Sequence, residues 1–386
     1  MRAGLTGISL AILATIATAQ AATPATPVPP PLAPEVLRVE PMPQRTDHWI
    51  YAVNLAGVLE TRIGIFDVDR KKTIGQIGAG MLPGLAQSAD HRYTYIATSY
   101  YSRGSTGERI DVLEITDNST LRKDGEVILP TKHAQQLPSA YNTTVSEDGG
   151  FLFVTNATPA TSMTIIDLKA RKVASEIDTA ACILAYPSGP RRFTSLCESG
   201  RALTVTLDAD GKEVRRDQSE RFIDVENDPV YTHAQRWGKD YLFLTFGGKV
   251  TPADFSVTPA RFGTPWPLVS AEDAAAGWRP GGYQPFAVHQ ASGRLYVGMH
   301  KGKEGSHKDG AAEIWVYDLN THQRLARWPL AEAKLLPVLA MMVTQDANPV
   351  LVGSTGIGLQ TFDARTGKLG FADRTLGHAI LQLSPY

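Results

Sequence analysis

Seven short stretches of this chain alternate apolar and polar residues and end in an aspartate at a turn. Alternation of this kind is typical of strands with one covered face. The aspartates recur roughly every 50 residues, a period that matches one four-stranded β-propeller blade rather than a helical solenoid. These aspartates are Asp67, Asp117, Asp167, Asp208, Asp254, Asp318 and Asp363.

A second series of seven stretches interleaves with the first and is almost continuously apolar. Runs of this kind are expected for strands that are covered on both faces, such as inner strands wedged between neighbouring blades. Gly-containing turns such as EDGG at 147–150 and RTGK at 365–368 suit tight hairpins. The two series together predict an all-β protein, a seven-bladed β-propeller of four-stranded antiparallel blades. The second series starts at residues 49, 93, 151, 193, 241, 295 and 350.

Each repeated aspartate has two interpretations. It is either a ligand or catalytic acid, or a turn residue that hydrogen-bonds its own backbone. A residue that recurs once per blade lies on a ring too wide for a single active site. The turn preference of aspartate therefore favours the structural role.

The two ends of the chain predict export and an extended arm. Arg2, the apolar stretch 5–19 and the triplet 19–21 have the layout of a secretory signal, so we expect residues 1–21 to be removed. The proline-rich residues 22–38 favour an extended arm, and residues 39–386 form the propeller. No later run of 18 or more apolar residues is present, which argues against a membrane span.

Charge and motifs exclude several classes of function. The 38 basic and 39 acidic residues nearly cancel, and no concentrated basic run is present, which argues against nucleic acid as a partner. No nucleophile elbow, zinc-protease helix or phosphate-binding loop is found. His300 and His307 are close enough to suggest a metal, but their Gly- and Lys-rich surroundings favour a solvated loop.

The chain contains only two cysteines, Cys182 and Cys197, 15 positions apart. A hairpin-like turn between them would bring the two thiols together. In an oxidising compartment such a pair forms a bridge more often than two free thiols, and the loop-entropy estimate for this bridge is about 3 kcal/mol.

Four motifs in the segment 271–318 point to a known family. They are a GW-x-PGG-aromatic turn, an H-x-ASGR strand start, a KEG-x-HK loop and an AAEIWV-x-D strand, at 277–283, 289–296, 303–308 and 311–318. With them, the segment resembles the heavy chain of the quinoprotein amine dehydrogenases. Similarity extends through most of the mature chain, and the KEG-x-HK and AAEIWV forms are closer to the aralkylamine branch than to the methylamine branch.

The resemblance implies a seven-bladed heavy subunit of a periplasmic enzyme with two heavy and two light chains. In this family primary amines, in this branch aromatic ones, are oxidised to aldehydes and ammonia by a tryptophan tryptophylquinone on the light chain. Electrons then pass to a blue-copper protein such as azurin or amicyanin. This chain is therefore expected to carry no catalytic residue and no cofactor, and its six dispersed tryptophans are expected to pack the blades.

The resemblance also implies that Met81 and Leu82 lie at the substrate channel, because family members have a phenylalanine at the position of Met81. A flexible methionine would keep an apolar gate while changing its width and stiffness. Met81 would then tune the preference for amines. The alternative is an ordinary core methionine beside a glycine turn.

Five further residues are predicted to lie at the light-chain interface. Arg103, Arg109 and Asp111 are expected to form ion pairs that set the docking register. Gly281 and Gly282 are expected to adopt positive φ and to let another chain's backbone approach. The spacing of Cys182 and Cys197 is similar to that of the heavy-chain disulfide of the family.

A second interpretation is a stand-alone periplasmic propeller of the YVTN or lactonase-like kind, which would bind a ligand or a protein partner at its central channel. Lactonase propellers need acids and a histidine or asparagine that converge on a metal. No such constellation is recognisable in the sequence.

Overall fold

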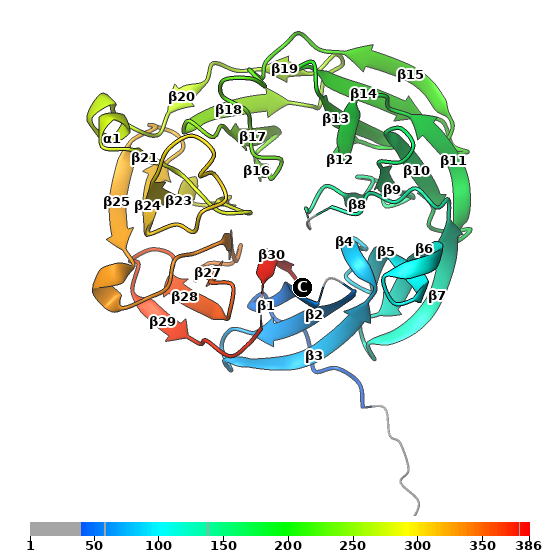
Figure 1. Cartoon of the computed structure of the whole chain (residues 1–386), viewed down its shortest axis with the longest axis horizontal. Helices are drawn as coiled ribbons and strands as arrows, with labels where there is room; N and C mark the ends of the chain where they lie inside the picture. Colours follow the sequence, from blue (N-terminus) through cyan, green and yellow to red (C-terminus); the bar gives the residue numbers. More distant parts are fainter. Residues whose placement is uncertain (1–39, 58, 137–138, 378) are drawn as a thin grey trace, which may run out of the picture. The chain divides into compact units, whose positions relative to one another are not determined.

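The computed structural model describes residues 40–57, 59–136, 139–377 and 379–386, and Glu40–Tyr386 form one compact unit. Seven antiparallel sheets of this unit lie side by side around a central axis (Figure 1), and the predicted seven-bladed propeller is confirmed. The predicted signal at 1–21 and arm at 22–38 lie outside the described residues and stay predictions. No helix of the described residues is long and apolar enough to cross a membrane.

Each blade has an inner, a second, a third and an outer strand, and we number the blades from the N-terminus. Blade 1 contains β30 (Ile380–Pro385), β1 (Trp49–Gly57), β2 (Glu60–Asp67) and β3 (Lys72–Ala79). Blade 2 contains β4 (Met81–Gln87), β5 (Tyr93–Arg103), β6 (Thr106–Asp117) and β7 (Arg122–Leu129). Blade 3 contains β8 (Thr143–Val145), β9 (Phe151–Asn156), β10 (Ser162–Asp167) and β11 (Lys172–Asp178). Blade 4 contains β12 (Cys182–Gly189), β13 (Arg192–Cys197), β14 (Ala202–Leu207) and β15 (Glu213–Gln218).

The remaining three blades follow the same order with small additions. Blade 5 contains β16 (Gln235–Trp237), β17 (Asp240–Leu244), β18 (Lys249–Asp254), β19 (Arg261–Phe262) and β20 (Trp266–Pro267). Blade 6 contains β21 (Trp278–Pro280), β22 (Phe286–His289), β23 (Arg294–Lys301), β24 (Glu313–Asp318) and β25 (Arg324–Pro329). Blade 7 contains β26 (Ala340–Val343), β27 (Val350–Ser354), β28 (Leu359–Asp363) and β29 (Leu369–Ala372). Helix α1 (Ala271–Ala275) connects blade 5 to blade 6, and a 3-10 turn (Ala331–Ala333) connects blade 6 to blade 7.

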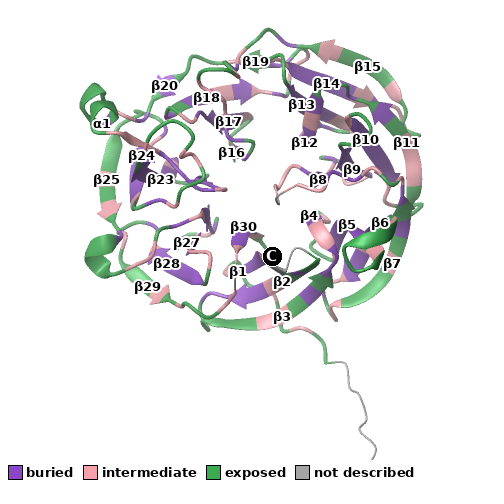
Figure 2. Ribbon diagram, viewed as in Figure 1, coloured by how far each residue is buried: buried purple, intermediate pink, exposed green. Residues whose placement is uncertain are grey.

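The hydrophobic core is divided among the spaces between blades. Each cluster of buried apolar residues joins two neighbouring blades. Phe151 and Phe153 of β9 pack toward blade 4, whereas Leu152 and Val154 pack toward blade 2. A second strand therefore needs apolar residues on both faces, which explains the continuous apolar runs. Outer strands such as β25 are largely exposed (Figure 2).

The seven repeated aspartates lie at the turn between the third and the outer strand of each blade. Each carboxylate accepts a hydrogen bond of 2.7–3.0 Å from a backbone N–H two or three residues later. Asp67, for example, accepts from Arg70 N, and Asp363 accepts from Arg365 N. The structural interpretation of the repeat is confirmed.

The two faces of the ring differ in what they carry. Because every blade repeats the same strand order, all inner strands run in the same direction and begin at the same face. The aspartate turns lie on the opposite face, where the third strands end. We call the face at which the inner strands begin the cavity face, because the cavity described below lies there. It holds Met81 at the start of β4, the tip of the β5–β6 hairpin and the start of β30.

The ring closes within blade 1, where the C-terminal β30 pairs antiparallel with the N-terminal β1. Gln284, which precedes β22, adds side-chain hydrogen bonds across the closure. Its amide donates to Met341 O and Leu383 O, both at 2.9 Å, and accepts from Leu383 N at 3.0 Å. One buried side chain therefore links blades 6, 7 and 1.

A second link across the closure involves His48. Its Nδ1 lies 2.7 Å from Asp69 Oδ1 in blade 1, and its Nε2 lies 3.2 Å from Asp346 Oδ1 in blade 7. Burial lowers the pKa of His48, but the hydrogen bonds and negative charges of Asp69 and Asp346 outweigh it, so the net shift raises the pKa above 6.5. The imidazolium form therefore stabilises the ring.

We predict that His48→Gln lowers the free energy of unfolding by about 1 kcal/mol at pH 6 and by less at pH 8. The raised pKa makes the contribution of His48 complete below the unfolded-state pKa, and it is lost as the pH rises through the folded-state pKa. Urea unfolding of wild type and variant at both pH values measures the difference. An equal loss at the two pH values contradicts the prediction.

Candidate functional site

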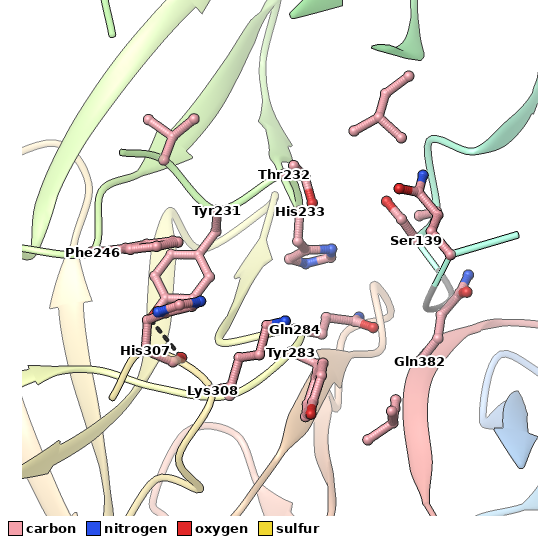
Figure 3. A pocket seen from close by; sticks show the side chains of 16 residues that line it. Ser139, Tyr231, Thr232, His233, Phe246, Tyr283, Gln284, His307, Lys308 and Gln382 are labelled. Carbon is pink, nitrogen blue, oxygen red and sulfur yellow. Dashed lines mark hydrogen bonds between the residues drawn. The ribbon is translucent and has the colours of Figure 1, made fainter. Parts of the chain in front are cut away.

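A cavity of about 440 Å³ lies at the ring axis on the cavity face (Figure 3). Its walls come from the segments before β8, β16 and β22, from the loops after β17 and β23, and from the start of β30. Residues from blades far apart in the sequence, such as Ser139, Tyr231 and Gln382, therefore share one cavity. It is the point at which the blades of the ring converge.

The cavity has an aromatic wall and a low density of charge. Lys308 is the only lysine, arginine, aspartate or glutamate among the sixteen residues that line it. Burial lowers the pKa of His233 to about 4. Burial, followed by the charge of Lys308, also lowers the pKa of His307. Both imidazoles are therefore neutral at pH 7.

Met81 begins the inner strand β4 and pairs with Ser99 of β5. Strands β5 and β6 form the longest hairpin of the described chain. The Sδ of Met81 is 3.4 Å from the donor Gln135 Nε2, and Gln135 Oε1 accepts a 3.0 Å hydrogen bond from the hydroxyl of Tyr101. Gln136, the next residue, lines the axial cavity. Met81 is partly exposed, so it lies at the surface beside the cavity.

Leu82 has a φ of +46°, and the register of β4 with β5 shifts between Met81 and Gly84. This irregularity is a bulge in an inner strand, a feature common next to functional sites. Both predicted channel residues thus lie on the cavity face. Their role toward a substrate stays a prediction.

The hairpin β5–β6 carries the three predicted interface residues with charged side chains. Arg109 donates to both carboxylate oxygens of Asp111, at 2.7 and 2.8 Å. Asp111 is 0% exposed and also accepts from His133 N, while Arg109 donates to His133 O. The ion pair therefore fixes the hairpin to the segment that leads into blade 3. Arg103 is exposed at the hairpin tip.

Gly281 and Gly282 differ from each other in conformation. Gly282 has a φ of +118°, but Gly281 does not have positive φ, so that part of the sequence prediction is wrong. A Cβ on Gly281 would lie 2.3 Å from His300 Nδ1, and one on Gly282 would lie 2.5 Å from Leu339 O. Close packing within this chain accounts for both glycines. Whether they also touch a partner stays a prediction.

The loop after β23, which contains His307, is largely exposed as expected, but His300 lies in strand β23 itself and not in the loop. His300 is only 5% exposed, and its Nε2 lies 3.0 Å from Ser306 Oγ. His307 stacks on Phe246 with ring centroids 3.9 Å apart. Within the described ranges, no group of three or more His, Cys, Asp or Glu residues is placed to hold a metal ion.

Cys182 and Cys197 form a disulfide, as predicted. They lie directly opposite each other on β12 and β13 of blade 4. The bridge therefore joins two adjacent strands, and its sulfurs lie in the core between blades 3 and 4.

The model of the methylamine dehydrogenase heavy chain family matches residues 51–383, which include strands of all seven blades. The chain belongs to the methylamine dehydrogenase heavy-chain family. The heavy chain of Methylophilus methylotrophus is 26% identical to it over 324 residues, which cover 82% of this chain and 78% of that one. The heavy chain of Methylorubrum extorquens is 27% identical over 314 residues, covering 79% of this chain and 74% of the relative.

Solved structures of other proteins share the fold of this heavy chain. The periplasmic gluconolactonase of Pseudomonas aeruginosa superimposes with a TM-score of 0.61 at 11% identity, covering 87% of the heavy chain and 98% of the lactonase. A putative 6-phosphogluconolactonase of Bacteroides fragilis gives 0.58 at 12% identity, covering 89% and 99%. At this level of identity the likeness shows the propeller fold alone. The family match makes the chain an amine dehydrogenase heavy subunit.

All six tryptophans of the heavy chain lie in or against the cores between blades. Trp278 and Trp315 are far apart in the sequence, yet their ring centroids are 5.2 Å apart. The guanidinium of Arg327 lies over both rings, 4.7 and 4.6 Å from their centroids. These contacts explain both side chains as packing.

Several residues of the candidate site were missed in the sequence. Gln135 contacts Met81 and Gln382 lines the cavity, but single polar residues before or within inner strands give no signal of their own. Lys308 and His307 lie in the KEG-x-HK loop, where the motif did mark the segment. Their place at the axis depends on the closure of the ring, which no local pattern contains.

We predict that Asp111→Ala lowers the free energy of unfolding by about 3 kcal/mol, because it leaves a mostly buried Arg109 without its partner. The matched control is Asp217→Ala, which breaks the exposed Arg215–Asp217 pair on β15. The control should cost less than about 1 kcal/mol. Thermal and urea unfolding measure both losses. A loss no larger than that of the control contradicts the structural role of Asp111.

Proposed function

We propose that this heavy chain is the non-cofactor subunit of a periplasmic amine dehydrogenase that depends on tryptophan tryptophylquinone. Two heavy and two light chains would oxidise primary amines, in particular aromatic ones, to aldehydes and ammonia. The match of the family model to residues 51–383 supports the assignment to a heavy subunit, and the KEG-x-HK and AAEIWV forms of the sequence support the preference for aromatic amines. The light chain would hold the quinone, which accepts the electrons of the amine.

The contribution of this chain is an apolar, adaptable side chain at the entrance to the quinone. Met81 supports this role because it is partly exposed on the cavity face. The hydrogen bond from Tyr101 to Gln135, and the contact of Gln135 with Met81, restrict where the thioether lies. The methyl end keeps its freedom, and a methionine adapts to ligands of different width.

The projecting β5–β6 hairpin is the proposed docking element for the light chain. Tyr100 and Ile110 are 40% and 47% exposed on it. They lie directly opposite each other on β5 and β6, so they form a small contiguous apolar patch that favours a protein contact. Arg109 and Asp111 hold the hairpin in place, and Arg103 at the tip is available for a charged contact that sets register. Gly281 and Gly282, in blade 6, are proposed as a separate contact with the light chain.

The remaining partners follow from the resemblance of the sequence to the family. The reduced quinone would pass electrons one at a time to a blue-copper protein of the azurin or amicyanin type. Export of the chain by the predicted signal at 1–21 would place the complex in the periplasm.

We predict that Met81→Phe lowers kcat/KM for benzylic amines by about tenfold relative to short alkyl amines, because a stiff ring narrows the channel. Met81→Leu keeps an apolar side chain of similar size and should leave the ratio near that of wild type. Ile357→Phe, at an exposed position of another loop, controls for added aromatic bulk. Steady-state kinetics of the purified complex measures the ratios. Unchanged ratios in Met81→Phe remove Met81 from the channel.

A test of the assembly is purification of the native complex followed by mass spectrometry and visible absorbance. We expect a small, cysteine-rich second chain that contains two cross-linked tryptophans, together with the absorbance of a quinone. A chain that purifies without a partner and without quinone absorbance contradicts the proposal. That result would favour the stand-alone propeller.

A further inference from the structure

Aromatic side chains line one side of the axial cavity, which is typical of a site that binds a planar ring. Phe246 stacks on His307 at an interplanar angle of 11°, and Tyr231 meets Phe246 with ring centroids 4.7 Å apart. Tyr283 contributes a further aromatic side chain from the segment before β22 (Figure 3). A volume of about 440 Å³ is within the range of small-molecule sites. Aromatic stacking inside it would add to the burial of an apolar ring.

The charged and neutral side chains of the cavity favour a ligand of negative charge. Lys308 Nζ lies 5.8 Å from the ring centroid of Tyr283, at the rim of the cavity. No aspartate or glutamate is among the sixteen lining residues, and His233 and His307 are neutral at pH 7. An anion in the cavity is therefore attracted by Lys308, whereas a cation meets this like charge and no carboxylate among the lining residues.

Two buried polar atoms of the lining residues have no hydrogen-bond partner, His307 Nδ1 and Gln382 Oε1. Gln382 is 2% exposed, and its Oε1 makes no hydrogen bond. The side chain extends from β30 into the cavity region opposite Lys308 (Figure 3). A buried carbonyl oxygen without a partner is costly. A ligand that offers an O–H or N–H at this point would satisfy it.

From these three observations we propose that the axial cavity binds an aromatic carboxylate that carries a hydrogen-bond donor on its ring. The carboxylate lies toward Lys308, the ring lies against Phe246 and Tyr231, and the donor reaches Gln382 Oε1. This inference rests on the cavity alone and does not depend on amine oxidation by the complex.

The test is isothermal titration calorimetry of the purified native protein, with any light chain that accompanies it, against 4-hydroxyphenylacetate. We expect saturable binding with a Kd below about 1 mM. Lys308→Met and Gln382→Met should each weaken binding about tenfold, since each removes one polar contact of the ligand. Lys303→Met changes a lysine of the same loop that does not line the cavity, and it should bind like wild type.

A second ligand tests whether the cavity prefers an anion to a cation. N,N,N-Trimethyltyramine keeps the phenol ring, replaces the carboxylate by a cation and is unable to form an imine with a quinone. We expect it to bind wild type at least tenfold more weakly than 4-hydroxyphenylacetate. This comparison uses the unmodified protein, so it decides the matter even where a variant fails to fold.

The proposal is overturned by any of three results. The first is the absence of saturable binding of 4-hydroxyphenylacetate to the native protein. The second is unchanged affinity in both folded variants, Lys308→Met and Gln382→Met. The third is binding of the cationic ligand as tight as that of the acid. Because turnover of amines is not the readout, these outcomes are independent of the proposed enzymatic role.

Discussion

The structure depends on the burial of apolar surface between neighbouring blades. Each cluster of buried apolar residues in the described part of the chain is shared by two sheets, and none of these clusters belongs to one blade alone. Phe153 and Val154 are neighbours in β9 but belong to different clusters. Stability is therefore a sum of contacts between neighbours around a ring, as in other repeat proteins. The loss of one interface leaves two blades with an uncovered face.

The two faces of the ring differ in how uniform their connections are. On one face the third strands end in similar turns, each held by an aspartate carboxylate such as that of Asp117. On the cavity face the connections vary in length and composition, and they carry Met81, the long hairpin and the axial cavity. Loops tolerate changes in sequence and length better than packed strands. The connections on the cavity face can therefore vary without disturbing the packing of the blades.

The sequence was sufficient for the parts of the fold that repeat. Continuous apolar runs and aspartate turns are local signals, and each blade reproduces them, so the number of blades and the role of the aspartates were predictable. The same holds for the disulfide, whose cysteines lie on adjacent strands. The candidate site was less accessible. The contact of Met81 with Gln135 joins residues 54 positions apart, and the burial of His300 depends on glycines whose packing has no local pattern. Gly281 was misjudged because a glycine serves close approach as well as positive φ.

The closure of blade 1 by strands from both ends of the chain has a consequence for the order of folding. Until the C-terminal residues have been synthesised, the edge of β1 that later pairs with β30 presents unpaired backbone groups. Such an edge is prone to pair with other chains. That edge stays open until Ile380–Pro385 pair with it. Truncation within these few residues would be expected to cause aggregation rather than a modest loss of stability.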